Sequence, residues 1–204
     1  MVNPHTLDQT PKVSGLVLAG GQSRRMGGLD KGLQQFQGTP LAKLAWNQLS
    51  PHVADMWIVA NRHLNDYAAL FPQNSILQDS ITGFAGPLAG MHAGLLAMEG
   101  DILVCVPCDT PNFPEDLVHR LIEPLKQRPE LTLTVAQAGD RIHPVFCALR
   151  ASAKLSIEYA LNEGQRGVYQ WLTRQSHQVV TFENPHQFTN LNTLDDLLKF
   201  QSGA

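Results

Sequence analysis

The feature that most constrains the fold is an unbroken apolar run at residues 102–106, between Asp101 and the polar turn that follows. The run is far shorter than the roughly 20 apolar residues that span a bilayer. Its β-branched residues favour a strand. A strand without alternating polar residues is typical of a parallel sheet buried on both faces. The chain is therefore expected to place helices on both sides of this strand.

The same pattern recurs along the chain, where apolar runs alternate with segments of helical spacing. Strands are expected at 13–19, 55–61, 75–79, 101–109, 131–138, 142–149 and 177–182. Helices are expected at 39–49, 88–99, 114–125, 151–164, 167–175 and 189–200. Residues 32–38 resemble a short hairpin arm, and the turn at 139–141 indicates an antiparallel strand pair. The fold class is α/β, a three-layer α/β/α arrangement around a mainly parallel mixed sheet.

Two helix starts have distinct signals in the sequence. Thr39 and Pro40 are expected to be the N-cap and first residue of one helix. Pro114 is expected to open another, with Glu115 and Asp116 in its first turn, where acidic side chains favour the helix dipole. Thr193 to Asp196 fits a capping box for the last helix.

Composition bounds the class of protein. The chain has 204 residues, 43% hydrophobic and 16% charged, without repeats or linkers, so a single domain over 1–204 is expected. The net charge of -3 gives no general reason to bind nucleic acid or an acidic membrane. The amino terminus does not resemble a secretory signal, and a cytoplasmic location is expected.

Three cysteines in such a chain argue against a disulfide framework. Cys105 and Cys108 form a C-x-x-C, which could indicate a redox pair or half of a zinc site. Residues three apart in a strand point to opposite faces, so a shared metal is disfavoured. Buried thiols that act as small hydrophobic groups are the preferred interpretation.

The stretch GLVLAGGQSRRMGGLDKGL, residues 15–33, combines glycines with Arg24, Arg25 and Lys31 directly after the first expected strand. It does not match the P-loop, because the lysine is followed by glycine instead of a hydroxyl residue. It does not match the dinucleotide fingerprint, because Gly20 and Gly21 are adjacent. Glycines permit close main-chain approach to a ligand, and the cations suit a triphosphate. A surface loop with a solvated basic cluster is the alternative.

Two carboxylates follow other strands at the same predicted sheet edge. Asp109 comes directly after the buried strand, where magnesium is commonly held by few protein oxygens together with phosphate oxygens. Asp79 ends the third strand. Each could instead cap a turn, a frequent role of aspartate. Together with the glycine-rich loop they indicate a site for a nucleotide and its magnesium ion.

The stretch LAGGQSRRMGGLDKGL resembles the signature L-A-G-G-x-S-x-R-M-G-x-D-K of the molybdenum cofactor guanylyltransferases, with one additional glycine before the Asp-Lys pair. GPLAG (86–90), PCDTP (107–111) and NLNTLDDL (190–197) resemble later motifs of that family in the same order. The resemblance spans residue 15 to about 200. It implies a Rossmann-like nucleotidyltransferase fold.

The resemblance also implies roles for individual residues. It gives Arg25, Lys31 and Asp109 catalytic roles, and magnesium would be held by Asp109 and Asn192. Nucleotide-binding residues would be Leu18, Ala19, Gly20, Gly21, Lys31, Asn61, Asp79 and Asp109. Simple alignment puts Val59 where some members have an asparagine, and Asn61 lies two residues on, on the same strand face. For Asn192 a structural role near the last helix is the alternative.

The acceptor would lie against the second half of the chain. His143 and Arg166 are the candidates, and each could equally be structural. The family is known for transferring GMP from GTP to molybdenum-molybdopterin, with release of pyrophosphate. Proteins that deliver or collect the cofactor are plausible partners. A cytidylyl- or sugar-phosphate nucleotidyltransferase and a non-catalytic nucleotide-binding adaptor are the alternative functions.

Overall fold

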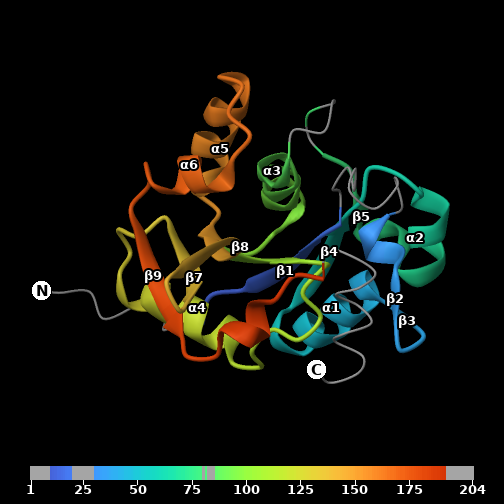
Figure 1. Cartoon of the computed structure of the whole chain (residues 1–204). Helices are drawn as coiled ribbons and strands as arrows, with labels where there is room; N and C mark the ends of the chain where they lie inside the picture. Colours follow the sequence, from blue (N-terminus) through green and yellow to red (C-terminus); the bar gives the residue numbers. More distant parts are fainter. Residues whose placement is uncertain (1–9, 20–29, 80, 82–85, 192–204) are drawn as a thin grey trace, which may run out of the picture.

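A seven-stranded sheet forms the centre of the computed structural model, which describes residues 10–19, 30–79, 81 and 86–191 (Figure 1). Its order is β5-β4-β1-β6-β8-β7-β9. The strands are β1 (Val13–Leu18), β4 (Asp55–Val59), β5 (Ile76–Leu77), β6 (Ile102–Pro107), β7 (Leu133–Ala138), β8 (Arg141–Arg150) and β9 (His177–Phe182). Only β8 among them runs antiparallel to its neighbours, β6 and β7. The expectation of a mainly parallel mixed sheet is confirmed.

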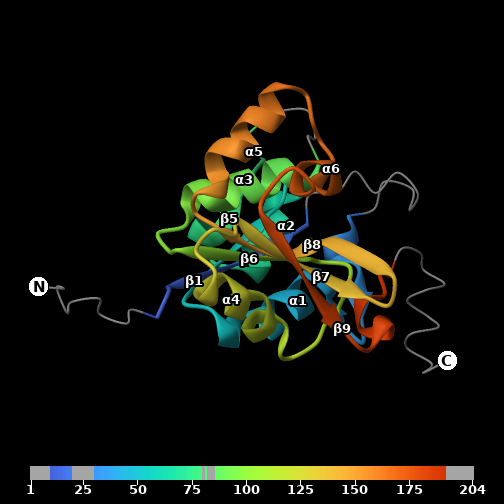
Figure 2. The ribbon, with the colours of Figure 1, turned by 90° about the vertical axis from the view of Figure 1, so that its left-hand side faces the viewer.

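Helices cover both faces of the sheet, as Figures 1 and 2 show from two directions. One face carries α1 (Leu41–Leu49), α2 (Leu64–Leu70) and α4 (Leu117–Gln127). The other carries α3 (Pro87–Ala97), α5 (Ala153–Asn162) and α6 (Val168–Leu172). Successive β6 residues alternate between the two cores, with Val104 on the α1 and α4 side and Leu103 on the α3 side. This two-sided burial explains why the run at 102–106 has no polar residue.

The cysteines follow the same alternation. Cys105 packs in the α3 core and Cys108 in the α1 and α4 core, and both are free and buried. Burial raises the pKa of each thiol well above its ordinary value. Among the described residues no group of three or more side chains could hold a metal through histidine, cysteine or carboxylate alone. The two thiols therefore serve separate cores.

The expected start of the first helix was wrong by one residue, because Leu41 and not Pro40 is the first helical residue. Thr39–Pro40 forms the strand β3, which pairs with β2 (Gln35–Phe36). Gln37 and Gly38 between them both have positive φ, 49° and 77°. Positive φ at both turn residues is the geometry of a tight type I′ hairpin, which takes up the residues expected to cap the helix. Helix α1 then begins at Leu41 without a side-chain cap.

The expected start of α4 was also wrong. The helix begins at Leu117, and Asp116 precedes it. The N–H of Leu117 donates to the carbonyl of Pro114 at 3.0 Å, so residues 114–117 form a separate turn. The short helix α2 was not expected. The helix expected at 189–200 falls outside the described residues from 192 onward, and the three described residues are not helical.

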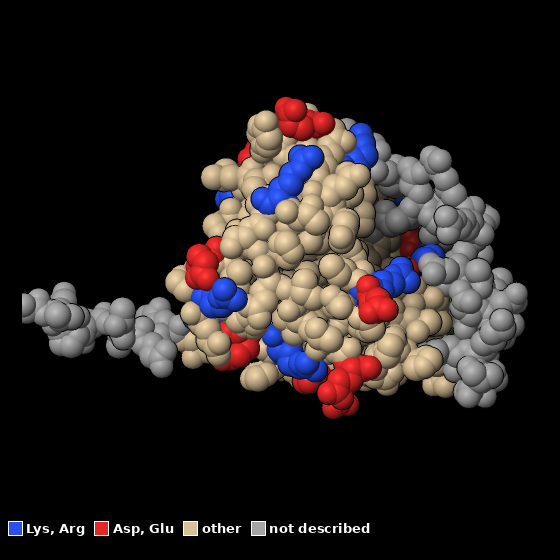
Figure 3. All heavy atoms as spheres, turned by 60° about the vertical axis from the view of Figure 1, so that its left-hand side comes forward, with Lys and Arg blue, Asp and Glu red and all other residues tan. Residues whose placement is uncertain are grey.

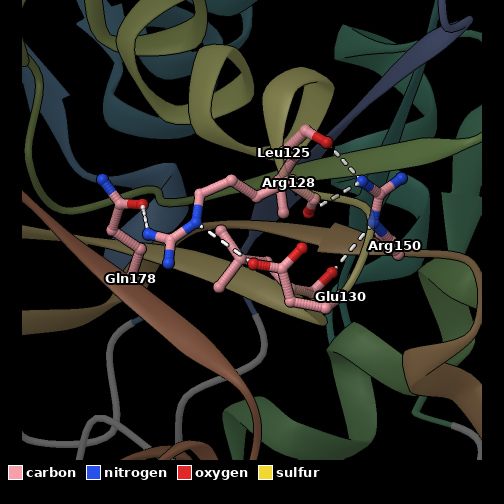
Figure 4. A network of polar contacts seen from close by, with 6 residues as sticks. Leu125, Arg128, Glu130, Arg150 and Gln178 are labelled. Atoms are coloured by element: carbon pink, nitrogen blue, oxygen red, sulfur yellow. Dashed lines mark hydrogen bonds and ion pairs between the residues drawn. The ribbon is translucent and has the colours of Figure 1, made fainter.

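Arg150, the last residue of β8, fastens the end of α4 to the sheet (Figure 4). Its guanidinium donates to the carbonyls of Leu125, Leu131 at 2.9 Å and Arg128 at 3.4 Å. The last carbonyls of a helix have no partner within the helix. This arginine therefore satisfies carbonyls that the helix geometry leaves open.

Charges of both signs are interspersed on the face that Figure 3 displays. Surface ion pairs include Lys12 with Asp55, 2.9 Å apart, and Lys126 with Glu123, 3.6 Å apart. Such exposed pairs contribute at most about 1 kcal/mol each. No helix in the described part of the chain is long and apolar enough to cross a membrane.

Candidate active site

The carboxyl ends of the four parallel strands at one side of the sheet are tied together by the main chain. Hydrogen bonds continue past the strand ends, from Cys108 N–H to Leu18 O (3.1 Å), Ala19 N–H to Val59 O (2.9 Å) and Ala60 N–H to Leu77 O (2.9 Å). From β1 the chain adds β4 and β5 on one side of the sheet and then β6 on the other side, so the order of strand addition reverses at β1. In α/β sheets such a switch point forms the ligand crevice.

Lys31 and Asp109 meet at this edge. The Lys31 Nζ donates to Asp109 Oδ2 at 3.0 Å, and the two side chains are 22% and 14% exposed. Asp109 Oδ1 is buried and accepts no hydrogen bond from the described residues. A buried carboxylate oxygen without a donor carries a desolvation cost that a cation would relieve. The pair therefore fits a site for phosphate and a divalent cation.

Asn61 and Asp79 meet further along the same edge. The Asn61 Oδ1 accepts the Asp79 N–H at 2.8 Å, whereas Asn61 Nδ2 is buried and donates to none of the described residues. Burial raises the pKa of Asp79 above its ordinary value. Val59 is buried in the apolar core, so Asn61 is the polar side chain at the end of β4.

Asp79 and Asp109 follow strands three positions apart in the sheet. Adjacent strands are about 4.8 Å apart, which separates the two strand ends by about 14 Å. Oxygen ligands contact a divalent cation at about 2.0–2.6 Å. The two strand ends therefore suit different parts of one extended ligand. Leu18 and Ala19 lie on the strand end between them.

The motif GPLAG has a steric explanation. Gly86 precedes α3 with φ 78° and ψ -173°, a conformation that is essentially restricted to glycine. A Cβ on Gly90 would lie 2.6 Å from Leu18 Cδ2, and 3.5 Å from an Asp79 carboxylate oxygen. Glycine thus lets α3 pack directly beneath Leu18 and Asp79.

His143 lies beside a bulge in β8. The pairing shifts from Val135 with Cys147 to Ala136 with His143, which leaves residues 144–146 unpaired. Its ring is 4.8 Å from that of Phe188, and burial lowers the pKa of His143. The structure places the histidine among aromatic side chains. This position is compatible with a structural role for His143 and with a role in contacting the acceptor.

The chain that follows Phe188 reaches the Asp109 turn. The Leu191 N–H donates to the Asp109 carbonyl at 2.8 Å, and the Thr110 hydroxyl donates to Asn190 at 3.0 Å. Arg166 lies apart, exposed in the connection between α5 and α6. A Cβ on Gly86 would be 3.1 Å from the Arg166 carbonyl. Among the described residues, the backbone of Arg166 therefore lies close to the amino end of α3, and no contact links Arg166 to His143.

Several expected site residues lie outside the described residues: Gly20, Gly21, Arg24, Arg25 and Asn192. The structure also shows two residues that sequence reasoning missed. Asp30, the residue before Lys31, accepts a buried hydrogen bond of 2.7 Å from the Tyr67 hydroxyl. The position of Asp30 beside Lys31 in the motif could have suggested a role for this aspartate. No local sequence signal identified Tyr67.

Known proteins resemble this chain over most of its length. The family model described as MobA-like NTP transferase domain matches residues 15–179. A protein named molybdenum cofactor guanylyltransferase from Bordetella pertussis is 40% identical over 193 residues, which cover 93% of this chain and 97% of that protein. One of the same name from Shewanella putrefaciens is 37% identical over 189 residues, covering 92% and 95%.

A solved structure extends the comparison to the fold. Molybdopterin-guanine dinucleotide biosynthesis protein A from Archaeoglobus fulgidus superposes with a TM-score of 0.76 at 22% identity, covering 93% of this chain and 97% of that one. The expected Rossmann-like nucleotidyltransferase fold is confirmed by this likeness and by the family model. The chain therefore belongs to the molybdenum cofactor guanylyltransferase family of MobA-like nucleotidyltransferases.

Proposed function

We propose that this enzyme transfers GMP from GTP to the molybdenum-molybdopterin cofactor, with release of pyrophosphate. The observation that carries the proposal is the pairing of Lys31 with Asp109 at the switch point of the sheet, where one Asp109 oxygen is buried without a donor. The names of relatives at about 40% identity over most of the chain support the choice of guanine and of the acceptor.

GTP would lie along the carboxyl edge of the sheet. Its nucleoside end would contact Asn61 and Asp79, and the main chain of residues 18–21 would approach it closely. Its phosphates would be bound by Lys31 and Arg25. The separation of about 14 Å between the strand ends that carry the two carboxylates supports this extended placement.

A magnesium ion would be held by Asp109, with Asn192 as a further oxygen ligand. The fit rests on the buried, unpartnered Asp109 Oδ1. When bound, such an ion neutralises charge that accumulates on phosphate oxygens during the transfer. Lys31, which is already 3.0 Å from the same carboxylate, places a second positive charge beside the phosphates.

The chemistry requires no general base from the protein. The terminal phosphate of molybdopterin is already an anion, and one of its oxygens would attack the α-phosphorus of GTP. A new phosphorus–oxygen bond forms as the bond to the β-phosphate oxygen breaks, and pyrophosphate leaves with that electron pair. The protein's task is to bring anions together and stabilise charge, which Lys31 and Arg25 would do.

The acceptor would occupy the carboxyl-terminal part of the single domain, near His143, with Arg166 as a candidate for its phosphate. The half-buried His143 ring, which packs against the buried ring of Phe188, offers a flat face suited to a heterocycle. The reaction would take place in the cytoplasm, where proteins that deliver and collect the cofactor would be partners.

Pyrophosphate release from GTP in the presence of molybdenum-molybdopterin tests the proposal. We expect release to require both substrates and to fall strongly in Lys31→Gln but not in the control Lys154→Gln on α5. Thermal-shift titration with GTP, CTP, ATP and UTP plus magnesium tests the base. A preference for CTP would contradict the guanine assignment, and nucleotide binding without release would favour the adaptor.

A further inference from the structure

Asp30, the residue before Lys31, is turned into the protein. It is 7% exposed, and its Oδ1 accepts two hydrogen bonds, from the Gly32 N–H at 3.0 Å and the Tyr67 hydroxyl at 2.7 Å. The first of these bonds caps the short 3-10 helix η2 (Lys31–Leu33). A carboxylate that accepts two internal donors is committed to holding the turn.

The donor, Tyr67, comes from α2 and is completely buried. Its ring lies 6.2 Å from that of Phe71 in the core that also contains Cys108. Burial raises the pKa of the hydroxyl far above its ordinary value, so the group remains a protonated donor at any working pH. The hydroxyl is therefore protonated and donates to Asp30 at 2.7 Å.

Gly32 supplies the space that this contact needs. A Cβ at that position would lie 2.2 Å from the Tyr67 hydroxyl oxygen and 3.2 Å from the Ala42 Cβ. No side chain is compatible with the first distance unless the tyrosine moves. The glycine after Lys31 and the buried tyrosine on α2 are thus sterically matched.

Lys31 stands between the two residues that this arrangement fixes. Three-residue 3-10 helices have poor hydrogen-bond geometry and depend on their surroundings for a defined position. We propose that Tyr67 is a positioning residue, which holds Asp30 and the Lys31–Leu33 turn so that the lysine ammonium lies beside Asp109. The inference deepens the proposed function, and rests on it for the identity of the ligand that Lys31 binds.

A double-mutant cycle on the dissociation constant of magnesium-GTP, measured calorimetrically without acceptor, tests this role. We expect Lys31→Gln to weaken binding about tenfold, because a charge-assisted contact is lost, and Tyr67→Phe about threefold to fivefold. In the double variant, Tyr67→Phe should add less than about twofold, because its effect passes through the lysine. Full additivity, or no effect of either change, would overturn the proposal.

Two further variants separate positioning from a direct role of the carboxylate. Asp30→Asn retains an oxygen that can accept both hydrogen bonds, and we expect it to bind GTP within about twofold of the original chain. Asp30→Ala, which removes both bonds, should weaken binding at least as much as Tyr67→Phe. If asparagine is as damaging as alanine, the charge acts directly and the positioning role is wrong. Tyr159→Phe, which alters an exposed tyrosine on α5, is the matched control.

A readout without nucleotide keeps this test independent of the proposed reaction. Hydrogen exchange of the Gly32 amide, which donates to Asp30, should accelerate about tenfold in Tyr67→Phe and remain unchanged in Tyr159→Phe. Unchanged exchange would refute the positioning role. Failure of the proposed function would instead appear as absent pyrophosphate release from the original chain.

Discussion

Replacing Asp109 with asparagine keeps the size of the side chain and removes its charge. Two unit charges 3.0 Å apart attract by about 5–6 kcal/mol at an effective dielectric constant near 20. Desolvation of the two mostly buried groups cancels much of this attraction. The buried Oδ1 that lacks a donor adds a cost of about 1–3 kcal/mol. We therefore expect Asp109→Asn to lower the free energy of unfolding by less than about 2 kcal/mol.

The effect on function should be much larger than the effect on stability. Loss of a preorganised group that stabilises charge costs about 10²- to 10³-fold in turnover. The variant should also lose the magnesium-dependent part of stabilisation by GTP. For the original chain, GTP at 100 times its dissociation constant adds about 2.7 kcal/mol, which raises the melting temperature of a domain this size by about 5–11 °C.

The assay combines pyrophosphate release with thermal denaturation in GTP, with and without magnesium. Asp140→Asn, an exposed residue in the turn between β7 and β8, serves as the matched control. A folded Asp109→Asn protein with normal turnover and the full magnesium-dependent thermal shift would refute the assignment. If the substitution lowered the free energy of unfolding by more than about 4 kcal/mol, the ion pair would instead be mainly structural.

Three further predictions concern Asp79, the packing of α3 and the anchoring of α4. Burial raises the pKa of Asp79. If ionised Asp79 binds the nucleotide, GTP affinity should therefore fall on acidification at a higher pH than it would with an ordinary aspartate. A pH titration in which affinity falls only in the range of an ordinary aspartate would contradict this. The raised pKa also means that ionisation of Asp79 lowers the free energy of unfolding of the nucleotide-free protein. This loss of stability increases as the pH rises through the raised pKa of Asp79. Gly90→Ala should reduce stability by about 1–3 kcal/mol in urea denaturation, because its Cβ would meet Leu18 at 2.6 Å, and unaltered stability would refute the packing argument. Arg150→Met should cost about 2–3 kcal/mol of unfolding free energy, because the carbonyl of Leu125 in α4 and those of Arg128 and Leu131 after the helix lose their charged donor. Turnover should stay within about twofold, and a large loss of turnover would contradict the separation of this network from the site.

The layered architecture could be predicted because its signals are local. The run at 102–106 and the alternation of strand and helix patterns indicate a buried, mainly parallel sheet. The turn at 139–141 located the antiparallel pair of β7 and β8. Helix starts were less predictable, since Thr39 and Pro40 suit both a helix cap and a hairpin strand. The positive φ angles of Gln37 and Gly38 form the tight turn that places Thr39 and Pro40 in the hairpin.

By itself, the sequence determined the class of fold, the order of the motifs and the presence of cations and carboxylates after apolar strands. Only the tertiary structure decided which of these residues meet. It paired Lys31 with Asp109 and Asn61 with Asp79, and turned Asp30 inward to Tyr67. Patterns of period two or 3.6 report the burial of each segment, whereas contacts between distant segments depend on strand order, which is set by how the helices pack on both faces of the sheet.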